Sequence, residues 1–168
     1  AAYRRNPLNI MVISPHPDDD VIGMGGTTRL LADKGCNVFS LYITDGSSRI
    51  FKNRNISLLR RQEALAGLKV VRARAGIFLN HKSAQLAKKT GSLVRQIRDI
   101  LQYFMPAEIY LPSPLERHKT HVLITSAAVQ SIRQIKNYCP SLWGYHVWGA
   151  ACGLSAVKAV DITGVIAV

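Results

Sequence analysis

Short apolar runs alternate with amphipathic patterns along this chain, and that alternation limits the folds that it can adopt. The apolar runs predict strands at 9–14, 37–44, 76–79, 108–111, 143–148 and 156–162. Helical spacing predicts helices at 27–34, 55–69, 84–104 and 122–135, the third with a break at Thr90 and Gly91. In the helix at 55–69, the spacing predicts one buried face, which contains Leu58, Leu59, Leu65 and Ala66. Strands separated by helices favour an α/β fold: a three-layer, Rossmann-like and mostly parallel sheet with helices on both faces.

The composition fits one globular domain at 1–168. Hydrophobic residues make up 48% of the 168 residues, and charged residues make up 19%. No apolar run approaches the roughly 20 residues that a membrane-spanning helix needs. The three cysteines, Cys36, Cys139 and Cys152, form no CxxC pair, which predicts reduced thiols and a cytoplasmic protein.

The charge of the chain is strongly positive, with a formal net charge of +12. The excess gathers at 49–74, where eight Lys or Arg accompany one acid, Glu63. Such a segment attracts anionic partners, and it suits a nucleic-acid surface, a phosphate-binding rim or a solvated face. Beyond Phe51 no aromatic residue interleaves with the charges, and no nucleic-acid motif is present. A solvated face that attracts anions is therefore favoured, and no nucleic-acid partner is expected.

The stretch at 14–20, directly after the first strand, carries one imidazole and three carboxylates. It has the sequence Ser-Pro-His-Pro-Asp-Asp-Asp, and a glycine cluster follows at 23–26. In a parallel sheet this stretch lies at the carboxyl end of the strand, where open α/β sheets bind ligands. The two prolines hold the backbone around His16 out of the α region. His16 and Asp19 can then point at one common atom, while Asp18 faces a different side.

These residue types support two interpretations. An imidazole and a carboxylate are good ligands for a divalent metal such as zinc, and a second carboxylate can take a proton from water. Alternatively, 14–20 is a surface turn whose aspartates, Asp18, Asp19 and Asp20, cap the next helix. Composition alone leaves both interpretations open.

A pair of histidines follows the strand predicted at 108–111. His118 and His121 are three residues apart at the entry to a helix, so they can share one face. Their loop is expected at the same edge of the sheet as the 14–20 stretch. His121 can therefore complete a three-ligand site with His16 and Asp19, which leaves one metal position for water. Histidines at a helix entry are also commonly solvated, and that alternative stays open.

Six motifs, in order along the chain, carry a resemblance to a known family. They are Pro15-His16-Pro17-Asp18-Asp19-Asp20, Val21-Ile22-Gly23-Met24-Gly25-Gly26-Thr27, Thr44-Asp45-Gly46, Arg60-Arg61-Gln62-Glu63-Ala64, Gly144-Tyr145-His146-Val147-Trp148 and Val160-Asp161-Ile162. In this order they resemble the zinc-dependent N-deacetylases of the LmbE-like or PIG-L family, typified by N-acetylglucosaminylphosphatidylinositol deacetylase. The resemblance covers nearly the whole chain.

The resemblance implies a function and a set of residue roles. It implies a hydrolase that removes an acetyl group from the nitrogen of an N-acetylated amino sugar, such as N-acetylglucosamine, or a related conjugate, through a zinc-bound water. The implied ligands of Zn2+ are His16, Asp19 and His121. Asp18 would be the general base, and His118 would protonate the leaving amine or stabilise the oxyanion. Arg60 or Arg61 would contact the substrate, and spacing does not decide between them.

The chain departs from the family pattern in several places. Asp20 replaces the usual glutamate, and Thr120 stands where an aspartate usually precedes the final histidine. The loop after the third strand, Asn80-His81-Lys82-Ser83, offers no aspartate. These departures put in doubt the support of the metal ligands. The chain also stops at Val168, where family members usually continue. We therefore expect a minimal family member, a chain whose tail is missing, or a non-catalytic relative.

Three hypotheses follow. The first is the zinc-dependent deacetylase, whose small-molecule substrate is anionic if the basic segment binds it. This hypothesis includes no membrane span, and the sequence is compatible with an oligomer. The second is a nucleotide- or phosphate-binding α/β module, although glycines at 23, 25 and 26 fail the G-x-G-x-x-G pattern. The third is a degenerate, non-enzymatic relative that binds anions.

Overall fold

The structure, a computed structural model, describes residues 7–47 and 55–148. Its elements, in chain order, are β1 (Asn9–Ser14), α1 (Asp19–Asp33), β2 (Asn37–Thr44), α2 (Ile56–Val70), β3 (Ala75–His81), the 3-10 helix η1 (Ser83–Lys89), α3 (Thr90–Phe104), β4 (Glu108–Pro112), α4 (Lys119–Arg133) and β5 (Ser141–Tyr145). The described strands form one parallel sheet in the order β3-β2-β1-β4-β5. The predicted α/β fold class is confirmed.

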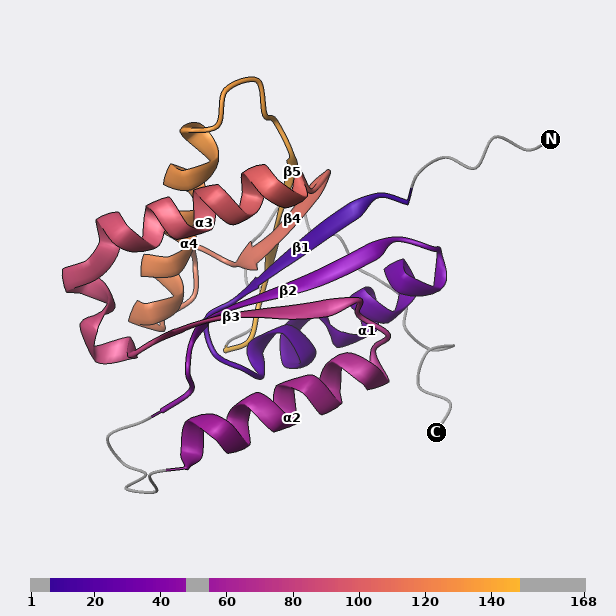
Figure 1. The fold of residues 1–168 in the computed structure, drawn as a ribbon, viewed down its shortest axis with the longest axis horizontal. Helices are drawn as coiled ribbons and strands as arrows, with labels where there is room; N and C mark the ends of the chain where they lie inside the picture. The colour runs from indigo at the N-terminus through magenta and orange to yellow at the C-terminus, as the bar shows by residue number, and fades with distance from the viewer. Residues whose placement is uncertain (1–6, 48–54, 149–168) are drawn as a thin grey trace.

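Helices cover both faces of the sheet, with α1 and α2 on one face and α3 and α4 on the other (Figure 1). The chain runs outward from β1 through β2 to β3 and then returns to the far side of β1 for β4. Because crossovers between parallel strands are right-handed, this reversal places the later helices on the opposite face. The reversal falls between β1 and β4, and open α/β sheets bind their ligands at such a point.

Alternate residues of β1 supply the cores of both faces. Met11 and Ile13 pack with apolar residues of α3 and α4, whereas Ile10 and Val12 pack with Met24 of α1. This alternation follows from the twofold period of a strand buried on both sides. β1 is therefore the centre of the fold: it is buried on both faces and paired with a strand on each edge.

The first helix begins earlier than predicted, at Asp19 rather than at residue 27. The expectation that the glycine cluster precedes the helix is wrong, because 23–26 lies inside α1. Glycine has low helix propensity, but tertiary packing overrides it here: α1 packs on the end of β5 through Gly23. α4 likewise begins at Lys119, before the predicted start at 122, with His118 as its N-cap residue.

The buried face predicted for α2 is wrong. Leu58, Leu59 and Leu65 are exposed, at 57%, 45% and 40%, and the buried positions are Ala64 and Leu68. α2 packs on the edge of the sheet, against a small cluster around β2 and β3, so only a narrow i, i+4 stripe is covered. The helix break predicted at Thr90 and Gly91 is confirmed, since η1 ends and α3 begins there.

Two further predictions concern the end of the chain and the membrane. The strand predicted at 143–148 runs from Ser141 to Tyr145, and the strand predicted at 156–162 lies outside the described residues. Within the described ranges, no helix has the length and apolar character that crossing a bilayer requires.

The contact between Gly23 and β5 gives a stability prediction. A Cβ at position 23 would lie 2.5 Å from Cδ2 of Tyr145 and 3.0 Å from the carbonyl oxygen of His146. We expect Gly23→Ala to lower the free energy of unfolding by about 1–3 kcal/mol, the usual effect of overpacking. Gly25→Ala is the matched control, because its Cβ meets only ordinary contacts at 3.6 Å and 3.7 Å. Urea denaturation of both variants measures the difference, and equal stability would contradict the clash.

Candidate active site

The turn between β1 and α1 is held by hydrogen bonds from the last residue of β1, Ser14, and the last residue of β2, Thr44. The Ser14 hydroxyl donates to the carbonyl oxygen of His16 at 2.6 Å and accepts the Asp20 N–H at 3.1 Å. From β2, the backbone N–H and the hydroxyl of Thr44 both donate to the carbonyl oxygen of Pro15, at 2.9 Å and 2.8 Å. The backbone that carries His16 is therefore held in place before any ligand binds.

Three side-chain atoms suited to a metal converge at the end of β1. Nδ1 of His16 lies 2.9 Å from Oδ2 of Asp19, and Nε2 of His121 lies 3.2 Å from the same oxygen. The two histidine nitrogens are 3.4 Å apart. Ligand atoms of a tetrahedral zinc, with bonds of about 2.0–2.1 Å, are about 3.3–3.4 Å from one another. The spacing of these three atoms therefore fits a zinc ion.

His118 joins the same cluster from the N-cap position of α4. One nitrogen from each of His16, His118 and His121 lies within 4.8 Å of the other two. The His118 ring is 4.6 Å from the ring of His121 and 5.3 Å from that of His16, measured between centroids. This second triad is wider than the one that contains Asp19, and His118 is the exposed member.

The buried charges of the cluster shift its titration. Burial opposes ionisation of Asp19, but hydrogen bonds from His121 and His16 outweigh it and hold the pKa of Asp19 well below its usual range. Burial also lowers the pKa of His121, but hydrogen bonding to Asp19 and the charges of Asp19 and Glu116 raise it above the ordinary value. For His118, burial and the neighbouring imidazoles lower the pKa. Asp19 is therefore ionised and ready to bind a cation.

Glu116 is a further residue of the cluster, and it was not predicted from the sequence. Its carboxylate is fully buried, and Oε2 lies 3.2 Å from Nδ1 of His121. Oε1 accepts the backbone N–H groups of Val147 at 2.5 Å and Trp148 at 3.1 Å. A carboxylate five residues before His121 therefore contacts that ring, although Thr120 is not an acid. A lone acid between the end of a strand and a histidine pair was the available signal.

The acidic-cap alternative for 14–20 is wrong. Asp18 occupies the N-cap position of α1, but its side chain makes no capping hydrogen bond. Asp20 is buried and accepts a 2.6 Å hydrogen bond from the Tyr42 hydroxyl, and burial outweighs that bond to raise the pKa of Asp20. Its buried place in the first turn of α1, bonded to Tyr42, makes Asp20 a structural residue. The three aspartates therefore have three different environments.

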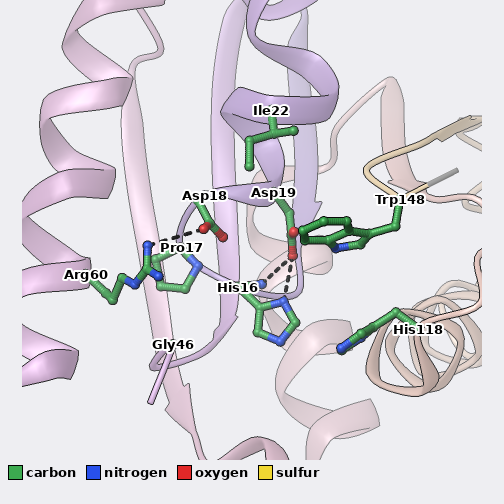
Figure 2. Close-up of a pocket in the computed structure, with 9 residues that line it drawn as sticks. All are labelled: His16, Pro17, Asp18, Asp19, Ile22, Gly46, Arg60, His118 and Trp148. Carbon is green, nitrogen blue, oxygen red and sulfur yellow. Dashed lines mark hydrogen bonds and ion pairs between the residues drawn. The ribbon is translucent and has the colours of Figure 1, made fainter. Parts of the chain in front are cut away.

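A pocket of about 210 Å³ opens beside the cluster. Its lining residues are His16, Pro17, Asp18, Asp19, Ile22, Gly46, Arg60, His118 and Trp148. Figure 2 shows Arg60 and Trp148 on opposite sides, with the Asp18–Asp19 turn between them. Asp18 points toward Arg60, and Nη1 of Arg60 is 3.4 Å from Oδ2 of Asp18. Trp148, 63% exposed, was not among the predicted site residues.

The two arginines that spacing did not separate lie in different places. Arg60 lines the pocket and also pairs with Glu63 at 3.4 Å. The Arg61 guanidinium stacks over the Phe78 ring, with its carbon 4.1 Å from the ring centroid. A cation on an aromatic face is held by the ring quadrupole. Arg60 is therefore the arginine that can reach a molecule in the pocket.

Gly46 brings the turn after β2 to the pocket. Its φ of +68° lies in the left-handed region, and a Cβ there would be 3.0 Å from Pro17 and 3.1 Å from Arg60. Close by in sequence, the buried Asp45 forms an ion pair with Lys82 of the loop after β3. Burial raises the pKa of Asp45, but hydrogen bonds from Lys82 and Ser47 outweigh it and lower the pKa. The loop that lacks the family's aspartate thus contributes a cation.

Comparisons with known proteins find a family model and relatives that match most of the chain. The family model described as GlcNAc-PI de-N-acetylase (PIG-L) matches residues 11–132. An uncharacterized deacetylase of Escherichia coli, YaiS, is 27% identical over 143 residues, which are 80% of this chain and 75% of that protein. The diacetylchitobiose deacetylase of Thermococcus kodakarensis is 27% identical over 116 residues, 67% of this chain.

A solved structure shares the fold. The N,N'-diacetylchitobiose deacetylase of Pyrococcus horikoshii, complexed with its inhibitor MPG, superposes with a TM-score of 0.77 at 24% sequence identity. The match covers 95% of this chain and 66% of that one. This chain spans only 43% of the length of the Thermococcus enzyme.

Proposed function

Because the chain belongs to the GlcNAc-PI de-N-acetylase (PIG-L) family, we propose that it is a zinc-dependent hydrolase that removes the acetyl group from a small N-acetylated amino sugar. The observation that carries this proposal is the convergence of His16, Asp19 and His121 at separations that suit zinc. The substrate class is supported by the diacetylchitobiose deacetylases that the chain resembles. A cytosolic location remains a prediction from the sequence.

The pocket supplies the groups that amide hydrolysis needs. His16, Asp19 and His121 would hold a zinc ion, which would supply a Lewis acid for the carbonyl and would lower the pKa of water to about 7. Asp18, half exposed on the pocket wall, takes a proton from the attacking water as the C–O bond forms. His118, on the other side of His16, stabilises the oxyanion or gives a proton to the nitrogen as the C–N bond breaks. Acetate and a free amine are the products.

The walls of the pocket suit a sugar. Trp148 offers a large apolar face, and Ile22 lies on the same rim. Arg60 offers a charged donor for a hydroxyl, a phosphate or a carboxylate of the substrate. The opposed positions of Trp148 and Arg60 in Figure 2 support a substrate that lies between them, with its acetamido group over the His16–Asp19 turn.

The structure disfavours a nucleotide-binding module. The glycines at 23–26 lie inside α1, so their N–H groups belong to a helix and do not form a loop around a phosphate. Gly23 also packs closely against Tyr145. The non-catalytic relative is kept as an outcome of the test.

The test combines metal content with product formation. We expect about one tightly bound zinc per chain, and equal amounts of acetate and free amine from a panel that contains N-acetylglucosamine, its phosphate and diacetylchitobiose. Zinc without any product from the panel would point to a different acylated substrate or to an inactive relative. Neither zinc nor product would contradict the proposal.

Arg60 and Arg61 are expected to differ in their effect on substrate binding. We expect Arg60→Ala to raise KM for an anionic substrate about tenfold or more, because a hydrogen bond to a charged group contributes about 1.5–3 kcal/mol. Arg61→Ala and Lys69→Ala are the controls and should change KM little. Steady-state kinetics at low and high salt measures all three. A similar small effect in all, lost at high salt, would mean that this surface acts only as a general positive field.

A further inference from the structure

The two oxygens of the Glu116 carboxylate serve two different parts of the pocket. Oε2 faces His121, and Oε1 accepts the backbone N–H groups of Val147 and Trp148, which follow β5. We infer that Glu116 is a positioning residue with two roles. It fixes the tautomer of His121, and it fixes the position of Trp148 in the pocket wall. The His121 half of this inference rests on the proposed zinc site.

The contact with His121 decides which ring nitrogen carries a proton. A carboxylate is only an acceptor, so the neutral His121 ring places its hydrogen on Nδ1, toward Glu116. Nε2 then keeps its lone pair, and Nε2 is the atom that faces Asp19 and His16. The carboxylate therefore holds His121 in the tautomer that can bind a metal. Both side chains are fully buried, so water does not replace this contact.

The second oxygen holds the wall of the pocket. The N–H groups of Val147 and Trp148 follow the end of β5, and Oε1 of Glu116 accepts both of them. The Glu116 loop is itself tied to β5, because the Ser113 N–H donates to the carbonyl oxygen of Tyr145 at 2.7 Å. The Trp148 side chain then lines the pocket beside Asp19 (Figure 2). One carboxylate thus links a metal ligand to a substrate-facing aromatic ring.

Glutamine at position 116 separates the two roles. The amide oxygen of Glu116→Gln can still accept the two backbone N–H groups. Its amide nitrogen then faces Nδ1 of His121 as a donor, which moves the imidazole hydrogen to Nε2. We expect zinc affinity, measured by competition with a chelator, to fall about 10–100-fold, the usual loss when such a partner is removed. The position of Trp148 should not change.

Alanine at position 116 removes both roles. The chain has two tryptophans, so a Trp143→Phe background leaves Trp148 as the only indole. In that background we expect Glu116→Ala to shift the fluorescence emission of Trp148 and to weaken zinc binding, whereas Glu116→Gln weakens zinc binding with the emission unchanged. If Glu116→Ala does not fold, Glu116→Asp replaces it, because its shorter carboxylate cannot reach both partners.

Glu108→Gln is the matched control, since Glu108 lies at the opposite end of β4 and its carboxylate accepts a hydrogen bond from Tyr110. It should leave zinc affinity and Trp148 emission as they are in the parent. The inference is overturned if Glu116→Gln binds zinc within about twofold of a zinc-binding parent, or if Glu116→Ala leaves the emission unchanged. A parent protein that binds no zinc overturns the proposed function and the role of Glu116 toward His121. The fluorescence emission of Trp148 still decides the role of Glu116 toward Trp148.

Discussion

Replacing Asp18 with asparagine is expected to lower the rate of amide hydrolysis by about 10²-fold or more, the usual contribution of a general base. Asparagine keeps the size of the side chain but cannot accept the proton of the attacking water. Zinc content should not change, because the Asp18 carboxylate pairs with Arg60 and is not one of the three converging ligand atoms. The rate of acetate release and the metal content of the purified variant together measure this outcome.

Asp33→Asn provides the control for that experiment. Asp33 lies at the far end of α1, where it pairs with Arg29 and Arg72 on the surface. The same chemical change there should leave the rate of hydrolysis near that of the parent. An Asp18→Asn protein as active as the Asp33→Asn protein would move the base to another residue.

Loss of zinc is expected when either of the two predicted histidine ligands, His16 or His121, is removed. We expect His16→Ala and His121→Ala to lower zinc affinity by more than about 100-fold, since removing only a supporting partner already costs about 10–100-fold. His118→Ala should keep most of its zinc, because His118 is the exposed histidine at the wider spacing. Chelator competition measures the affinities, and thermal unfolding of the metal-free proteins checks that each variant folds.

Asp19→Asn decides between the two triads that share His16 and His121. Asp19 has the tighter spacing, with its Oδ2 2.9 Å and 3.2 Å from the two histidine nitrogens. We therefore expect Asp19→Asn to lose more zinc than His118→Ala. The reverse order would assign His118 as the third ligand and leave Asp19 as its neighbour.

The fold was predictable because its signals are local. β1 and β2 were predicted with the bounds that the structure shows, since both are continuous apolar runs flanked by polar turns. The buried residues Leu93, Ile97 and Leu101 of α3 recur four residues apart, a helical pattern that is local in the sequence. The start of α1 and the exposed leucines of α2 were not predictable, because they depend on where the helices pack on the sheet.

The candidate site divides in a similar way. His16, Asp19 and His121 could be brought together from the sequence, because parallel strands end at one edge of the sheet and both loops follow such strands. Their assignment as metal ligands stays a prediction. Glu116 and Trp148 were missed, because their contact joins the loop after β4 to the residues after β5, which are distant in sequence. The choice of Arg60 over Arg61 likewise needed the position of Phe78.

The boundary between β1 and β4 has a consequence for the thermodynamic stability of the protein. His16 and His121 are 105 residues apart in sequence and lie on the two sides of that boundary. A metal ion held by both binds the native chain and not the unfolded one, so it shifts the unfolding equilibrium. At a free concentration 100 times its Kd, an ion adds about 2.7 kcal/mol to the free energy of unfolding. Under the proposed function, the resistance of this chain to unfolding would then vary with the free zinc concentration around it.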